Sequence, residues 1–143
     1  MDHVAIMKES WGMADKILSG EKRIESRWYM SRSSPWDEIK SGDAVYFKDA
    51  GGPVRIRAEV EKVLQFSDLT PRKVKTLLKE YSRLNGIGES DESKFFHILR
   101  KKKYCILIFL RGAKEVRPFE VRKAGFGAMS AWMTVKNIDN VKK

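Results

Sequence analysis

The stretch that decides the fold is GEKRIESRWY, which occupies residues 20–29. Glycine adopts the left-handed backbone conformation easily, so Gly20 predicts a helix that ends there and is followed by a strand. Side chains alternate between the two faces of a strand, so the charged residues at its odd positions are expected on one face. Lys22, at the bend, can turn its ammonium toward Glu25 and Arg27. Such a cluster beside aromatic rings suits the recognition of phosphates and bases.

The segments around this stretch predict further elements. Residues 3–8 favour a short strand, and residues 10–19 favour a helix with Ser10 as its N-cap. The strand that contains Glu25 is expected to end at Met30. Further strands are expected over residues 44–48, 104–110, 116–121 and 130–135, with a turn at Gly112.

The clearest strand runs from Val54 to Val60, where apolar even positions alternate with charged odd positions. This pattern predicts one buried face and one wet face. The alternation slips near Lys62, which indicates a β-bulge at that point. Because bulges help to bend a sheet, this slip favours a sheet that curls into a barrel.

Two helices are predicted after the long strand. Thr70 and Pro71 form a helix start, with an N-cap followed by proline at the first position, and Gly86 is expected to end the helix. A second helix is expected over residues 90–99. The four cations that follow, at 100–103, suit a helix C-terminus. They could also contact phosphates, but a solvated helix end is the favoured interpretation.

Length and composition indicate a globular protein of one domain. The chain has 143 residues, of which 42% are hydrophobic and 34% are charged, enough to bury a core. The domain is expected over 1–136, with a basic, mobile tail over 137–143. The longest apolar run, 105–110, is far short of the roughly 20 residues that a spanning helix needs. With no basic leader at residues 1–8, we expect a cytoplasmic protein without a membrane partner.

No metal site and no cofactor are expected. His3 and His97 stand apart from residues at metal-ligand spacing. The single cysteine, Cys105, lies in the apolar run. It is therefore expected to be a buried small hydrophobe rather than a nucleophile.

The charge balance is basic. Lysine and arginine number 29 against 19 acidic residues, which gives a formal net charge of +10 and a sequence pI near 9.8. This balance is typical of proteins that bind nucleic acid. A solvated basic surface would give the same numbers, so charge alone leaves both interpretations open.

At residues 20–27 the sequence resembles the ASCH domain family of the PUA-like superfamily. The signature of that family is glycine, any residue, lysine, any two, glutamate, any residue and arginine, and it is complete here as Gly20, Lys22, Glu25 and Arg27. Four fixed positions would match by chance in roughly one chain of this length in several hundred. Segments that resemble the small single-domain bacterial and archaeal members are 8–12, 28–29, 35–36, 60–66, 104–110 and 130–132.

The resemblance implies an α+β fold, a small mixed β-barrel of five to six strands surrounded by helices. In PUA-like domains a cleft between barrel and helix commonly takes RNA, DNA or a modified base. Cations of the signature would then meet a phosphate, its glutamate would meet a base edge, and a tryptophan would stack the base. The ligand-binding residues implied are Lys8, Lys22, Glu25, Arg27, Trp28, Trp36 and Trp132.

Whether the protein is an enzyme stays open at this point. Some relatives are small amidohydrolases that deacetylate a modified cytidine, using the signature lysine with a threonine at the position that Glu25 occupies here. A carboxylate can act as a general base but does not offer the chemistry of a hydroxyl nucleophile. Other relatives are ribonucleases. Lys22 and Glu25 are the candidates for any catalytic role.

Three hypotheses follow, in this order. The first is binding of RNA, another single-stranded nucleic acid or a modified nucleoside in a cationic cleft built on the signature. The second is hydrolysis of RNA or of a modified nucleoside. The third is a scaffold that binds only proteins. The oligomeric state is open, and a monomer is favoured.

Overall fold

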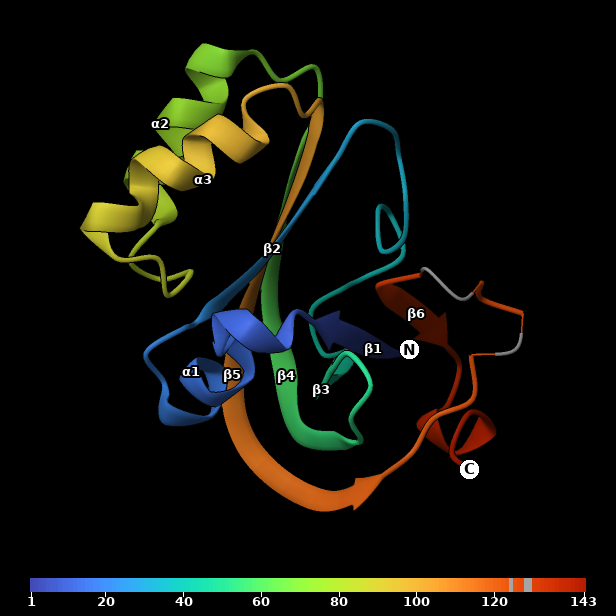
Figure 1. Cartoon of the computed structure of the whole chain (residues 1–143). Coiled ribbons are helices and arrows are strands. Elements are labelled where there is room, and N and C mark those ends of the chain that lie inside the picture. The colour runs from blue at the N-terminus through green and yellow to red at the C-terminus, as the bar shows by residue number, and fades with distance from the viewer. Residues whose placement is uncertain (124, 128–129) are drawn as a thin grey trace.

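The structure is a computed structural model that describes residues 1–123, 125–127 and 130–143. A six-stranded sheet in the order β2-β5-β4-β3-β1-β6 forms its centre. β1 and β3 are parallel, and the other neighbouring strands are antiparallel. The sheet is mixed and curls as a half-barrel with β2 and β6 at its edges (Figure 1). The strands are β1 Asp2–Met7, β2 Ile24–Tyr29, β3 Ala44–Asp49, β4 Val54–Phe66, β5 Tyr104–Phe119 and β6 Trp132–Val135.

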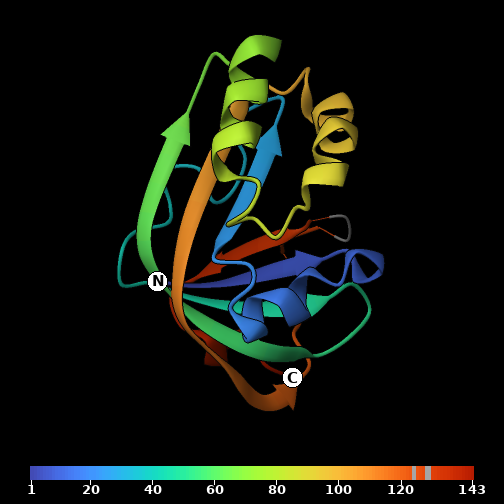
Figure 2. The same cartoon turned by 90° about the vertical axis from the view of Figure 1, so that its left-hand side faces the viewer.

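Three α-helices in the described part of the chain complete the predicted α+β fold. α2 and α3 lie side by side at one end of the half-barrel, and α1 lies beside its bent lower part (Figure 2). Thr70 caps α2 as predicted, because its hydroxyl accepts a hydrogen bond from the Lys73 N–H at 3.2 Å. The helices are α1 Met13–Ser19, α2 Pro71–Tyr81 and α3 Glu92–Leu99, and the 3-10 turns are η1 Glu9–Trp11, η2 Glu89–Asp91 and η3 Ile138–Asn140.

The first helix starts later than its sequence predicts. Ser10 was the predicted N-cap, but it lies within η1, and Gly12 occupies the N-cap position of α1. Gly12 has a φ of 62°, which glycine tolerates and which turns the chain between η1 and the helix. The prediction that Gly20 ends the helix is confirmed, with a φ of 85° at that residue.

β4 and β5 form a long, curved ribbon that gives the sheet its curl. Their pairing shifts register three times, and one shift lies between Val60 and Lys62, where the sequence predicts a bulge. The prediction of two strands separated by a turn at Gly112 is wrong, because β5 runs unbroken from Tyr104 to Phe119. Gly112 has a φ of 62° and lies where the register slips, so it bends the strand instead of ending it.

Residues 137–143, predicted as a mobile tail, pack against side chains of β4 and β6. Ile138 and Val141 are buried in a small core with Val54, Val121 and Met133. The backbone N–H of Lys143 also donates to the Glu120 carbonyl at 3.0 Å. The end of the chain therefore completes this second, smaller core.

The start of β2 is fixed to the loop that follows α2. The N–H groups of Arg23 and Ile24 both donate to the Leu84 carbonyl, at 2.7 and 2.9 Å. β2 then pairs with β5 from Ile24 to Tyr29. This arrangement holds the signature between the sheet on one side and the α2–α3 unit on the other.

Candidate functional site

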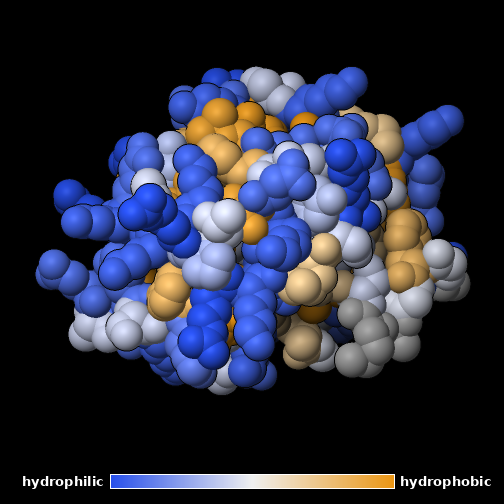
Figure 3. Space-filling view, turned by 90° about the horizontal axis from the view of Figure 1, so that it is seen from above, coloured by the Kyte–Doolittle hydropathy of each residue, from blue (hydrophilic) through white to orange (hydrophobic). Residues whose placement is uncertain are grey.

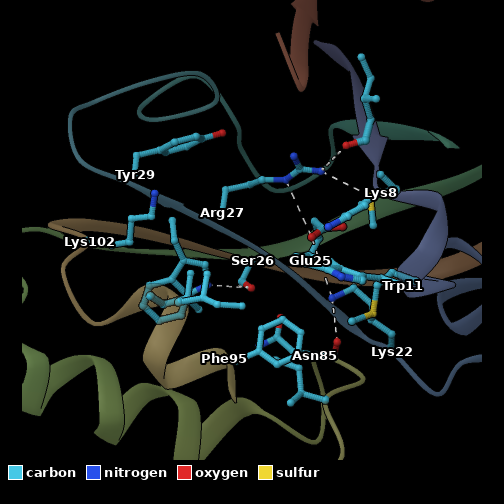
Figure 4. Close-up of a pocket in the computed structure, with 17 residues that line it drawn as sticks. Lys8, Trp11, Lys22, Glu25, Ser26, Arg27, Tyr29, Asn85, Phe95 and Lys102 are labelled. Atoms are coloured by element: carbon cyan, nitrogen blue, oxygen red, sulfur yellow. Dashed lines mark hydrogen bonds and ion pairs between the residues drawn. The ribbon is translucent and has the colours of Figure 1, made fainter. Parts of the chain in front are cut away.

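A cavity of about 360 Å³ opens beside β2. Its wall is built from the end of β1, the η1 turn, β2, the loop after α2, and α3 (Figure 4). Lys8, Lys22, Glu25, Arg27 and Trp28 line it, so the structure brings together five of the seven predicted ligand-binding residues. The other residues of its wall are Ile6, Met7, Trp11, Met13, Ser26, Tyr29, Asn85, Ile87, Phe95, Ile98, Leu99 and Lys102.

Glu25 lies between two cations at the polar end of the cavity. Its Oε1 is 3.9 Å from Arg27 Nε and 4.0 Å from Lys22 Nζ. These are ion-pair distances that are too long for hydrogen bonds. Lys22 Nζ instead donates to the backbone carbonyl of Asn85 at 2.9 Å.

Lys22 is buried at the bend between α1 and β2. Its side chain is 4% exposed. Burial lowers the pKa of Lys22; the Glu25 carboxylate acts in the opposite direction, and the Arg27 cation adds to the lowering. The helix-to-strand bend is real, but the loop after α2 covers it, and no local pattern in residues 20–29 indicates that loop.

Three polar atoms of this cluster are buried without a hydrogen-bond partner among the described residues: Glu25 Oε2, Arg27 Nε and Asn85 Oδ1. All three residues line the cavity. The Asn85 amide is oriented by its Nδ2, which donates to the Tyr81 carbonyl at 3.2 Å, so Oδ1 is the atom left as an acceptor. A buried polar atom without a partner costs about 1–3 kcal/mol. A polar ligand that reaches them would supply the missing partners.

Aromatic and apolar side chains form the rest of the cavity wall. Trp28 is held by its indole N–H, which donates to Ser26 Oγ at 3.1 Å. Trp11 and Phe95 meet edge to face with ring centroids 5.5 Å apart. Lys8 Nζ lies 5.1 Å from the Trp11 ring centroid. The cavity thus has one charged end and rings along its sides.

Two predicted site residues lie outside the cavity wall. Trp36 meets Tyr104 edge to face at 5.2 Å, near the far end of β2. Trp132 is 3% exposed, and the Arg27 guanidinium lies over its ring at 5.1 Å. Trp132 therefore packs against the Arg27 guanidinium. Because the Trp132 ring is buried, it has no open face on which a base could stack.

Trp132 belongs to a chain of contacts that runs away from the cavity. Its indole N–H donates to His3 Nδ1 at 3.1 Å, and His3 Nε2 lies 2.8 Å from Asp43 Oδ2. An indole N–H can only donate, so the ring proton of His3 is on Nε2 and is donated to Asp43. This buried chain fixes the indole on which Arg27 rests.

Sequence reasoning missed Asn85 and Phe95, which come from the loop after α2 and from α3. Neither carries a local signal, because asparagine before glycine indicates a turn and an aromatic residue on a helix face indicates packing. Trp11 also lines the cavity. Its side chain is 42% exposed, so it is not a core residue. These residues reach the site only through the fold.

The fold matches solved structures over nearly its whole length. It matches ASCH from Zymomonas mobilis over 97% of this chain and 90% of that chain, with a TM-score of 0.68 and 17% identity. A single-residue variant of the same protein matches with the same TM-score at 18% identity, over 97% of this chain and 91% of that chain. The N-terminal domain of Staphylothermus marinus McrB matches over 83% and 76%, with a TM-score of 0.50 and 14% identity.

The comparisons by sequence give a different result, because no protein-family model and no curated protein matches this chain. Structural likeness at 17% identity speaks for the shared architecture. The mixed, curled sheet and its helices are those that the signature at residues 20–27 predicts. The chain therefore has the fold of the ASCH domain proteins, a PUA-like fold.

Proposed function

We propose that this protein binds a nucleobase in the cavity beside β2, either as a nucleoside or as an unstacked base of RNA. The observation that carries the proposal is the set of three buried polar atoms without partners in the described residues, all on residues of the cavity wall. Proteins that hold an unstacked base hydrogen-bond its edge and stack its faces between apolar or aromatic side chains. The polar end and the ring-lined sides of this cavity supply both kinds of contact.

The size of the cavity supports a single base or nucleoside. A volume of about 360 Å³ lies near the lower end of the range of roughly 300–1,000 Å³ that is usual for small-molecule sites. Stacked or paired nucleic acid would not fit within it. A strand of RNA would therefore bind with one base extruded into the cavity and its backbone outside.

The charges around the cavity support a ligand that carries phosphate. Lys8, Lys22, Arg27 and Lys102 line it against the single carboxylate of Glu25. Seen from the end at which α2 and α3 lie, hydrophilic side chains cover most of the surface, with hydrophobic patches between them (Figure 3). The net charge of +10 can attract a polyanion without reading its sequence.

Titration calorimetry with nucleosides and with short single-stranded RNA tests the proposal. Trp11→Ala removes a ring of the cavity wall from an exposed turn, and we expect at least tenfold weaker binding, since a base-stacking contact contributes about 1–3 kcal/mol. Trp36→Ala, the same change outside the cavity, is the control and should keep the affinity. If wild-type protein binds none of these ligands, the proposal fails, and the hypothesis of a scaffold that binds only proteins is favoured.

Hydrolysis of RNA or of a modified nucleoside is the second candidate function, and one observation favours it. The lowered pKa of buried Lys22 makes its neutral amine more accessible, as a general base requires. An assay for product release from RNA and from nucleosides separates this function from binding. Turnover that Lys22→Met abolishes would support an enzyme, whereas tight binding without turnover would leave the protein a binder.

A further inference from the structure

We propose that the cavity selects bases that carry an exocyclic amino group over the matched bases that carry a carbonyl oxygen in its place. This inference rests on the proposed function and adds the chemical class of the ligand. It follows from which of the cavity's buried polar atoms are donors and which are acceptors. Two of the three unpaired atoms, Glu25 Oε2 and Asn85 Oδ1, are acceptors.

Glu25 presents a carboxylate. It pairs with two cations, since Lys22 Nζ and Arg27 Nε lie within 4.0 Å of its Oε1. An ionised carboxylate accepts hydrogen bonds and donates none. The atom Oε2 therefore needs a donor from the ligand, because no partner lies among the residues that the structure describes.

Asn85 presents its amide oxygen in the same way. Its nitrogen already donates to the Tyr81 carbonyl at 3.2 Å, which leaves the oxygen as the free end. Asn85 and Glu25 share Lys22 as a neighbour, since Lys22 Nζ bonds the Asn85 backbone carbonyl at 2.9 Å and lies 4.0 Å from the carboxylate. Both acceptors thus belong to one end of the cavity (Figure 4).

The third unpaired atom, Arg27 Nε, is a donor and sits on the other side of Glu25, at 3.9 Å from Oε1. An amino group offers two N–H donors, and in cytosine and adenine an acceptor ring nitrogen lies next to it. The amino group can serve both acceptors while the ring nitrogen accepts from Arg27. Uracil and hypoxanthine instead place a carbonyl oxygen there, which would face two acceptors and leave them unpaired.

The expected discrimination is large, because sites built to hydrogen-bond a ligand group reject analogues that lack it, by as much as about 10⁴–10⁵ in favourable cases. Partial compensation by water reduces this effect. We therefore expect the amino ligand of each matched pair to bind at least tenfold more tightly than its oxo counterpart.

Calorimetry with two pairs of nucleosides tests the inference on the wild-type protein. Cytidine is compared with uridine, and adenosine with inosine, because within each pair an amino group is exchanged for oxygen. Tighter binding of cytidine and adenosine supports the inference. Equal binding within both pairs, or tighter binding of the oxo ligands, overturns it while the proposed function stands. If all four nucleosides fail to bind, the inference falls, and the proposed function falls with it only if short single-stranded RNA also fails to bind.

Glu25→Gln tests the assigned acceptor directly. The change keeps the shape of the side chain but exchanges one acceptor oxygen for a donor nitrogen, which can meet a carbonyl oxygen of the ligand. We expect the ratio of cytidine to uridine affinity to fall at least tenfold. Glu21→Gln is the matched control, since it makes the same change on an exposed neighbour outside this cavity. An unchanged ratio in a folded Glu25→Gln protein would overturn the role of Glu25. If that variant does not fold, the wild-type ratios decide.

Discussion

At the scale of one residue, the Lys22 side chain connects the start of β2 with the loop after α2. Its ammonium bonds the Asn85 carbonyl, neighbours the Glu25 carboxylate and is shielded from water. Gly86, which follows Asn85, would place an added Cβ only 3.1 Å from the Cβ of Lys22, so the loop lies directly on the lysine stem. A residue that the sequence marks as a ligand contact is therefore also part of the structure.

This dual role gives a prediction for stability. We expect Lys22→Ala to lower the free energy of unfolding by about 1–3 kcal/mol, because it leaves a buried carbonyl unpaired and takes one cation from Glu25. Urea denaturation measures the change. Lys8→Ala, an exposed lysine of the same cavity, should alter stability by less than about 0.5 kcal/mol. Equal stability of Lys22→Ala and wild type would show that the buried contacts of the lysine contribute little.

The residues of the signature could be predicted from the sequence, and their setting could not. Four fixed positions identify Lys22, Glu25 and Arg27 because their spacing is local: Glu25 and Arg27 lie on β2, and Lys22 lies just before it. Asn85 lies more than 60 positions away and meets Lys22 only because the loop after α2 covers the start of β2. Its role depends on tertiary packing, which leaves no pattern in the nearby sequence.

At the scale of elements, the same contrast appears in the β4–β5 ribbon. Alternation of apolar and charged residues predicts the first half of β4 and its bulge, since both follow from side-chain period. The continuity of β5 through Gly112 could not be predicted, because glycine is equally suited to a turn and to a bulge inside a strand. Pairing with β4 decides between them.

The register of β4 gives the second prediction. Ile56 is fully buried, whereas Arg57 points away and its Nε donates to the Tyr46 hydroxyl at 3.3 Å. Ile56→Asp would bury an unpaired carboxylate and should leave the protein unfolded by circular dichroism at 25 °C. Arg57→Asp should remain folded. Similar behaviour of the two variants would mean that the two faces of β4 are not distinguished in this way.

The contact of His3 with Asp43 and Trp132 joins β1 and β6 to the turn before β3, and it gives a prediction for pH. Burial lowers the pKa of His3, while the hydrogen bond and the charge of Asp43 oppose this effect. Other charges that act on the ring are the amino terminus, which lowers its pKa, and Glu38, which raises it. Because the folded pKa lies below the unfolded value of about 6.5, protonation favours the unfolded chain.

Stability should therefore fall as the pH is lowered from about 6.5 toward the folded pKa, by at most about 1.4 kcal/mol per pH unit for one proton. Burial raises the pKa of Asp43, but hydrogen bonds from His3 and the Lys40 N–H outweigh it and lower the net value, so its contribution is lost only at still lower pH. Thermal melts of wild type and His3→Gln between pH 7 and pH 5 measure the effect, with His97→Gln as the control. We expect a flatter profile for His3→Gln. Parallel profiles for these proteins would show that another group sets the slope.

At the scale of the whole molecule, the helices and the sheet edge define where a ligand can enter. Among the described residues no helix is long and apolar enough to cross a membrane. The half-barrel places the signature on edge strand β2, and α3 lies across the cavity from it. Under the proposed function, a base that enters between them would leave its sugar and phosphates near Lys8 and Lys102, which line the cavity. On this proposal, the net charge would attract the backbone of a nucleic acid, and the cavity would bind one base.

If the net charge attracts the backbone and the cavity binds the base, RNA and a free nucleoside should respond differently to salt. Binding of single-stranded RNA should weaken with salt, with a log–log slope of about −0.7 for each phosphate neutralised, because counterions are released. Binding of an uncharged nucleoside should be nearly independent of salt, and an excess of nucleoside should displace the RNA if both use the cavity. Lys102→Ala, at the cavity, should reduce the RNA slope by about 0.7 while the exposed Lys136→Ala, outside it, should not. Fluorescence anisotropy of labelled RNA between 50 and 300 mM salt measures these slopes. A flat response for RNA would identify the net charge of +10 as a solvated surface and would leave the cavity with the free nucleoside alone.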